Sequence, residues 1–255
     1  MRNILLTIEY DGTRFLGWQR QPDCRTVCGT VEEALSVLFG FPVKIDGTSR
    51  TDAGVHARGQ RATLRVPDDG IPTDKIAYAA NSLLAPDKVE CIGDVRILKA
   101  EEMPEGFHAR HSCTGKRYIY KIFNSPEKSV FRRTQFYQIG KPLNLDAMRK
   151  AAAYIIGEHD FACFQTSGSN KQDSTVREIY KLDITEKDGL IEITVEGNRF
   201  LYNMVRIIVG TLVEVGLGKR SPEDLPAIIE SKNRGKAGHL APPQGLYLDE
   251  VFYGE

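Results

Sequence analysis

The feature that most restricts the fold is a pair of short alternating runs joined by an Asp-Gly turn. Apolar and polar residues alternate over 179–185 and again over 190–195, with Lys187-Asp188-Gly189 between them. A period of two is typical of a strand with one buried face. Asp-Gly is a preferred two-residue link between antiparallel strands. We therefore predict a β-hairpin, which favours antiparallel pairing over a purely parallel sheet.

Strand and helix patterns alternate along the rest of the chain. Further strands are expected at 4–10, 43–48, 60–66, 89–98, 115–124, 133–139 and 246–253. Helices are expected at 30–39, 73–84, 144–156 and 201–215, and Ser221-Pro222-Glu223-Asp224 opens one more. Thr73 and Asn144 are expected to cap their helices through their side chains, and the polar stretch 165–175 is expected to be a mobile loop. The mixture predicts an α+β fold of two similar halves, with domains at 1–105 and 106–255.

Charge is balanced overall but clustered locally. The formal net charge is zero, which counts against a protein that coats nucleic acid without regard to sequence. Between residues 106 and 133, Glu127 is the one acidic residue among a group of lysines and arginines, and a second group of basic residues lies near the C-terminus. The basic residues of the first group are Arg110, Lys116, Arg117, Lys121, Lys128, Arg132 and Arg133. Those of the second group are Lys232, Arg234 and Lys236, followed by His239. Each group is either a solvated face or an RNA contact.

The cysteine content and the absence of familiar motifs narrow the function classes. Five cysteines without regular spacing do not indicate a disulfide scaffold, and a reducing cytoplasm is the expected location. No spacing provides the four ligands of a structural zinc site. No glycine-rich nucleotide motif follows a strand, so a nucleotide cofactor is not expected. The N-terminus lacks the features of a signal peptide, and no apolar stretch is long enough to span a bilayer.

The segment from Thr48 to Ala57 is the strongest candidate for chemistry. It places Asp52 beside Ala53 and Gly54, with Arg50 two positions before it. Small neighbours let a ligand approach the backbone, and an arginine can hold a phosphate or keep the carboxylate ionised. These are the needs of a nucleophilic carboxylate. An aspartate that only stabilises a turn stays an alternative on these residues alone.

Arg206 is a second candidate because it lies within an apolar helical stretch. A buried cation demands a partner of opposite charge. Asp52 is the preferred partner, and Glu214 and Glu196 are the alternatives.

The segment from Ser49 to Ala57 resembles the catalytic motif of the bacterial tRNA pseudouridine synthase A (TruA) family, whose members modify the anticodon arm. Further blocks of the chain match the family in the same order, from residue 9 to residue 246. They are Glu9-Tyr10-Asp11-Gly12-Thr13, Phe15, Gly17-Trp18-Gln19, Pro22, Phe107-His108-Ala109-Arg110, Lys116-Arg117-Tyr118-Ile119-Tyr120, Gly157-Glu158-His159-Asp160-Phe161, Phe200-Leu201-Tyr202-Asn203-Met204-Val205-Arg206, Ala241-Pro242-Pro243 and Gly245-Leu246. The sequence departs from the family at Cys28, where glutamine is usual, and at Ser49, where glycine is common.

The resemblance implies a role for each matching position. Asp52 would be the essential carboxylate, Tyr118 would stack on the flipped base, and Arg206 would pair with Asp52. Arg50 would fill the space of the flipped nucleotide or grip its phosphate, and Leu246 would pack against the base. Further substrate-binding residues are expected at His56, Arg58, Phe107, Arg110, Lys116 and Arg117.

The resemblance also implies the fold and the reaction. The fold would be that of the pseudouridine synthases, with a catalytic cleft between two similar halves. The protein would isomerise uridine to pseudouridine in the anticodon stem-loop of tRNAs, at positions 38–40, by base flipping and an aspartate nucleophile. No cofactor or metal is expected, and the partners would be tRNA and a second copy in a homodimer. Two alternatives stay open: a synthase for another RNA site, and a non-catalytic tRNA-binding chaperone that needs neither Asp52 nor Arg206.

Overall fold

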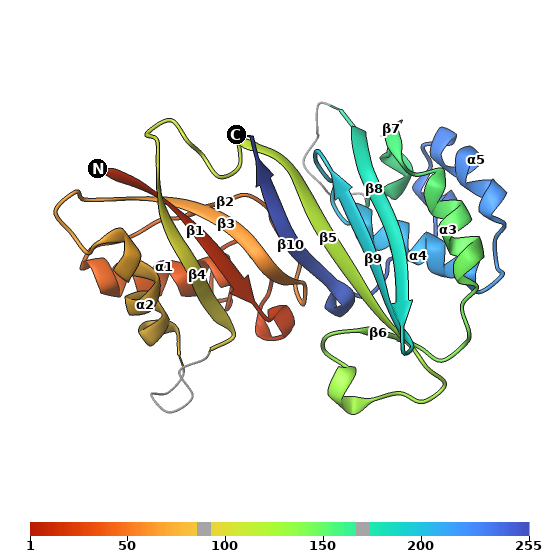
Figure 1. The fold of residues 1–255 in the computed structure, drawn as a ribbon, viewed down its shortest axis with the longest axis horizontal. Helices are drawn as coiled ribbons and strands as arrows, with labels where there is room; N and C mark the ends of the chain where they lie inside the picture. Colours follow the sequence, from red (N-terminus) through yellow and green to blue (C-terminus); the bar gives the residue numbers. More distant parts are fainter. Residues whose placement is uncertain (86–92, 167–173, 255) are drawn as a thin grey trace. The chain divides into compact units, whose positions relative to one another are not determined.

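The computed structural model describes residues 1–85, 93–166 and 174–254 (Figure 1). Contacts between Cα atoms divide the chain into two compact units. The first unit holds Met1–Thr114 and Tyr247–Glu255, and the second holds Gly115–Leu246. The last strand of the chain therefore returns to the first unit. These units are defined by contacts, and a domain boundary near residue 105 stays a prediction.

The first unit is built on a mainly antiparallel sheet. Its strands lie in the order β4 (Val95–Met103), β1 (Arg2–Tyr10), β3 (His56–Val66) and β10 (Leu246–Tyr253), and β2 (Asp46–Gly47) pairs with β3. β1 runs antiparallel to both β3 and β4, whereas β3 and β10 are parallel. Ile4, Leu6 and Ile8 of β1 are fully buried, as their alternation predicts. The expected strand at 246–253 is confirmed at both ends.

Two helices complete the first unit, α1 (Val27–Phe39) and α2 (Thr73–Leu84). α1 begins after Thr26, whose hydroxyl accepts a hydrogen bond from the Gly29 amide. The cap expected at Thr73 is wrong. Pro72 precedes the helix without a side-chain cap, and the Thr73 hydroxyl accepts from Arg2 Nη1 at 3.0 Å instead.

The second unit contains the hairpin that the sequence predicts. Its strands lie in the order β5 (Cys113–Asn124), β9 (Leu190–Gly197), β8 (Val176–Lys187) and β7 (Gly157–Asp160), and β6 (Tyr137–Ile139) pairs with β5 in parallel. β8 and β9 pair antiparallel across Asp188 and Gly189, whose φ angles are 54° and 73°. Two left-handed residues are what a type I′ turn requires, and the hairpin prediction is confirmed.

Three helices belong to the second unit, α3 (Leu145–Ala153), α4 (Met204–Gly216) and α5 (Leu225–Glu230). The cap predicted at Asn144 is confirmed, because its side chain accepts from the Ala147 amide at 3.0 Å. α4 is buried at every residue except Glu214. A helix that is apolar all round has to be covered on all sides, and its burial explains the long apolar run in the sequence.

Several expected elements differ from the structure. The strand expected at 43–48 is present only over Asp46–Gly47. The helix expected at 30–39 begins at Val27, the one expected at 144–156 ends at Ala153, and the one expected at 201–215 begins at Met204. The strand expected at 89–98 begins at Val95, and residues 89–92 lie outside the described residues, as does 167–173 of the expected loop. The strand expected at 133–139 is present only over Tyr137–Ile139. Arg132 ends a 3-10 turn with its guanidinium 4.1 Å from the Phe123 ring centroid, and pairing with β5 begins only at Tyr137.

The described cysteines support a prediction about reactivity. Cys24, Cys28, Cys113 and Cys163 are all free thiols. Burial raises the pKa of both Cys28 and Cys163 to about 12, so these two thiols stay protonated at pH 8. We expect iodoacetamide to leave Cys28 and Cys163 unmodified in the native protein and to modify them in urea. Peptide mass mapping measures this, and rapid native alkylation of either buried thiol would contradict the described core.

Candidate functional site

The candidate carboxylate lies in a loop between β2 and β3 of the first unit. Ser49 and Thr51 are buried in this loop, whereas Arg50 is exposed and Asp52 is half-buried. The Val55 amide donates to the Asp52 carbonyl at 3.1 Å, which closes a turn directly after the carboxylate. The loop therefore presents Arg50 and Asp52 on its accessible side.

Gly17 supports this loop from behind. Its φ is +87°, a value that side chains rarely tolerate, and a Cβ there would lie 2.7 Å from the Thr51 carbonyl oxygen. The Trp18 amide donates to the same oxygen at 3.0 Å. The N-terminal block that resembles the family thus packs against the backbone of the candidate catalytic loop.

His56 is the least exposed of the expected substrate-binding residues in the first unit. Its side chain is 2% exposed, and its Nδ1 lies 3.2 Å from Asp11 Oδ1. The ring stacks on Tyr247 at 4.7 Å between centroids. The hydrogen bond from His56 is the largest influence that holds the Asp11 pKa well below its usual range. These contacts fit a supporting role behind the loop better than a direct contact with RNA.

The other expected substrate-binding residues of the first unit are more accessible. Arg58 is exposed, with its guanidinium 5.5 Å from the Tyr247 ring and 3.4 Å from an Asp249 carboxylate oxygen. Phe107 is half-buried against Tyr253, with 5.0 Å between the ring centroids. Arg110 is exposed. A polyanion could therefore reach two arginines in this unit.

Residues 116–118 lie on β5 in the second unit and point alternately to its two faces. Arg117 Nε donates to Glu196 Oε1 at 2.7 Å, and the two residues are directly opposite in the β5–β9 ladder. Lys116 is half-buried. Tyr118 is 8% exposed, and its ring meets Phe200 edge-on at 5.0 Å. The aromatic pair therefore lies on the opposite sheet face from the ion pair.

Arg206 is held by backbone and amide groups of its own unit. It is 9% exposed in the first turns of α4. Its Nε donates to the Ala241 carbonyl at 2.8 Å, and its Nη1 donates to Asn203 Oδ1 at 3.0 Å. Glu214 and Glu196, the alternative partners, contact other cations: Glu214 binds Arg220, and Glu196 binds Arg117.

Asn203 is a site residue that the sequence analysis missed. It stands in the left-handed region at φ 62°, immediately before α4. Its Oδ1 accepts from Arg206, and its Nδ2 donates to Thr166 Oγ1 at 2.9 Å. An asparagine at the start of a helix, three residues before an arginine, was the available signal, because that spacing puts both side chains on one face.

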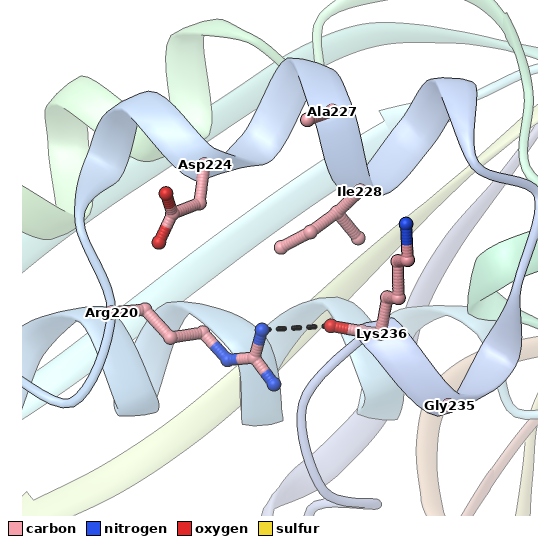
Figure 2. A pocket seen from close by; sticks show the side chains of 6 residues that line it. All are labelled: Arg220, Asp224, Ala227, Ile228, Gly235 and Lys236. Carbon is pink, nitrogen blue, oxygen red and sulfur yellow. Dashed lines mark hydrogen bonds between the residues drawn. The ribbon is translucent and has the colours of Figure 1, made fainter.

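The pockets of the two units lie apart from most of these residues. Figure 2 shows one of about 300 Å³ in the second unit, lined by Arg220, Asp224, Ala227, Ile228, Gly235 and Lys236. Its arginine is already engaged, because Arg220 Nη1 donates to the Lys236 carbonyl at 2.7 Å. The pocket of about 310 Å³ in the first unit includes Arg58 and Arg61. The pocket in Figure 2 therefore contains no residue of the candidate site.

Two absences can be stated for the described part of the chain. Over residues 1–85, 93–166 and 174–254, no group of three or more His, Cys, Asp or Glu side chains is placed to hold a metal ion. Within the same ranges, no helix combines the length and apolarity needed to cross a membrane.

Comparison with known proteins identifies the family. Residues 6–111 and 151–254 match the family described as tRNA pseudouridine synthase. A tRNA pseudouridine synthase A from Ruminiclostridium cellulolyticum is 50% identical over 254 residues, which cover 99% of this chain and all of the relative. Relatives of the same name from Acetivibrio thermocellus and Caldicellulosiruptor bescii are each 46% identical over 253 residues, 99% of this chain and all of theirs. The expected pseudouridine synthase fold is thereby confirmed, and the chain belongs to the tRNA pseudouridine synthase family.

Proposed function

We propose that this protein isomerises uridine to pseudouridine in tRNA, with Asp52 as the catalytic carboxylate. The observation that carries the proposal is the loop at Asp52. A half-buried carboxylate near an exposed arginine stands on a loop that packs against Gly17, within a chain whose relatives carry the synthase name.

The chemistry requires a nucleophile and no cofactor. The C–N bond between ribose and uracil breaks, the uracil turns, and a C–C bond forms between C1′ and C5. The hydrogen on C5 leaves as a proton, and the released ring nitrogen gains one, so electrons and atoms balance without an oxidant. Asp52 forms the transient covalent bond, to ribose C1′ or to the uracil ring. Tyr118 accepts the stacked base and helps to remove the proton.

Access to the reacting atoms requires base flipping. A nucleotide must leave its stack at a cost of a few kcal/mol, and an aromatic face returns about 1–3 kcal/mol by stacking. The edge-on contact of Tyr118 with Phe200, at 5.0 Å between ring centroids, supports this role because it restrains the tyrosine ring. Leu246, which is 7% exposed, supplies an apolar surface for the base. Arg206 supplies the positive charge that keeps the Asp52 carboxylate ionised and oriented.

The RNA-binding roles are part of the same proposal. Arg50, Arg58 and Arg110 are exposed and suit phosphate contacts. Lys116 and Arg117 precede Tyr118 on β5, and Arg117 lies on the opposite sheet face from Tyr118, where it pairs with Glu196. The target is the anticodon stem-loop, and the working form is a cytoplasmic homodimer that binds tRNA. A monomeric mass by light scattering at assay concentration would count against the dimer.

The proposal is tested with unmodified tRNA carrying uridines in the anticodon arm. After incubation with the protein, pseudouridine is located by chemical derivatisation and primer extension. We expect stops at uridines on the 3′ side of the anticodon arm. Stops elsewhere would assign a different RNA site, and tight binding without any stop would favour the non-catalytic chaperone.

A further inference from the structure

We propose that Tyr10 and Gln60 are positioning residues that hold Thr51 and Ser49, the residues on either side of Arg50, and so set the place of the Asp52 carboxylate. The inference rests on the proposed function of Asp52. It concerns two side chains that have no place in the chemistry described above.

The loop has the alternation of an extended strand. Ser49 and Thr51 are each 7% exposed and face inward, whereas Arg50 is exposed and Asp52 is half-buried. In extended backbone, neighbouring side chains point to opposite sides. Whatever holds residues 49 and 51 therefore determines where residues 50 and 52 are presented.

Gln60 holds the position before Arg50. Its side chain is completely buried on β3. Its Nε2 donates to the Ser49 carbonyl at 2.7 Å, and its Oε1 accepts from the Ser49 amide at 3.4 Å and from the Arg61 amide at 3.1 Å. The Gln60 side chain thus gives the buried Ser49 backbone the two hydrogen bonds that a neighbouring strand would otherwise provide. Because these bonds reach the backbone, they do not depend on the serine that replaces the family's glycine.

Tyr10 holds the position between Arg50 and Asp52. Its hydroxyl lies 2.7 Å from Thr51 Oγ1, in a contact that is buried and spans 41 positions of sequence. The Thr51 carbonyl is held independently by the Trp18 amide at 3.0 Å. Thr51 is therefore fixed through both its side chain and its backbone, one residue before the carboxylate.

These contacts explain how a loop without regular secondary structure can serve a reaction that needs exact placement. A displacement of about 1 Å in a reacting group can lower a rate about a hundredfold. Hydrogen bonds to buried backbone resist such displacement, because breaking one leaves a polar group unsatisfied. Losing Tyr10 or Gln60 contacts should therefore slow the chemical step and leave tRNA affinity unchanged.

The test compares variants under single-turnover conditions with saturating protein. Tyr10→Phe and Thr51→Val each remove one hydroxyl, and Thr51→Ser retains it. Gln60→Met keeps the length of the side chain and removes both the donor to the Ser49 carbonyl and the acceptor for the Ser49 amide. We expect Tyr10→Phe, Thr51→Val and Gln60→Met to lower the single-turnover rate by about tenfold to a hundredfold, with tRNA Kd within about twofold of wild type. Thr51→Ser should recover most of the rate, and Tyr10→Phe/Thr51→Val should be no slower than the slower single variant.

Asn81→Leu is the matched control. Asn81 bonds both backbone groups of Ile97 at 2.8 Å in the same unit, which is the same kind of contact away from the loop. It should lower the unfolding midpoint without changing the single-turnover rate of the folded protein. Asp52→Ala is measured alongside: activity in that variant would overturn the proposed function itself. If Asp52→Ala is inactive while folded Tyr10→Phe and Gln60→Met react at the wild-type rate, the positioning role is overturned and the function stands.

Discussion

Asp52→Ala is expected to abolish pseudouridine formation while tRNA binding stays close to that of wild type. Removal of a nucleophile costs a factor on the order of 10⁴ or more in rate, equivalent to about 5 kcal/mol of transition-state stabilisation. The Asp52 side chain is half-buried in the loop. Truncation to alanine keeps the backbone hydrogen bond from the Val55 amide to the residue 52 carbonyl. The loss should therefore lie in turnover and not in folding.

Three measurements on the same preparations separate a loss of turnover from a loss of tRNA binding or of folding. Filter binding gives the tRNA affinity, primer extension gives the product, and urea unfolding gives the stability. Asp69→Ala is the matched control, because Asp69 is an exposed aspartate of the same unit outside the candidate site. It should behave as wild type in all three. Product formation by Asp52→Ala would remove Asp52 from the catalytic role.

Gly210→Ala is expected to destabilise the second unit by about 2–3 kcal/mol, although helix propensity alone predicts a gain of about 1 kcal/mol. A Cβ at this position would lie 1.8 Å from the His239 carbonyl oxygen, a backbone atom that cannot rotate away. The segment after His239 would have to move off α4. Since Ala241 on that segment accepts from Arg206 Nε at 2.8 Å, activity should fall as well.

Urea unfolding measures the first effect, and Gly140→Ala provides its control in the same unit. A Cβ at Gly140 meets nothing closer than 3.7 Å, so its substitution should change stability by less than about 0.5 kcal/mol. A stabilised Gly210→Ala protein would show that α4 and the His239 segment do not pack as described.

The sequence predicts the elements whose signals are local. The Asp188-Gly189 turn, the Asn144 cap and the strand at 246–253 each depend on neighbouring residues, and all three agree with the structure. Thr73 has the same local signal as Asn144, but its hydroxyl is used by Arg2, 71 positions away. The strand expected at 133–139 is shorter than predicted, because only Tyr137–Ile139 find partners on β5.

Some residues of the candidate site could likewise be predicted from local motifs, and others could not. Asp52, Arg50 and Tyr118 stand in motifs that can be read directly from the sequence, the first two in a loop and Tyr118 on β5. The groups that hold the site have no such signature. Arg206 is bound by the carbonyl of Ala241, which every residue possesses, and Gln60 is buried although glutamine is usually exposed. Contacts to distant backbone atoms become visible only in the folded chain.

The most direct test of the proposed reaction follows the hydrogen on C5 of uridine. Transfer RNA made with uridine labelled by tritium at C5 is incubated with the protein, and the label released into water is counted. Isomerisation predicts one tritium released for each pseudouridine formed, no free uracil, and no release with Asp52→Ala. Tight binding of the labelled tRNA without release, or release accompanied by free uracil, would contradict it.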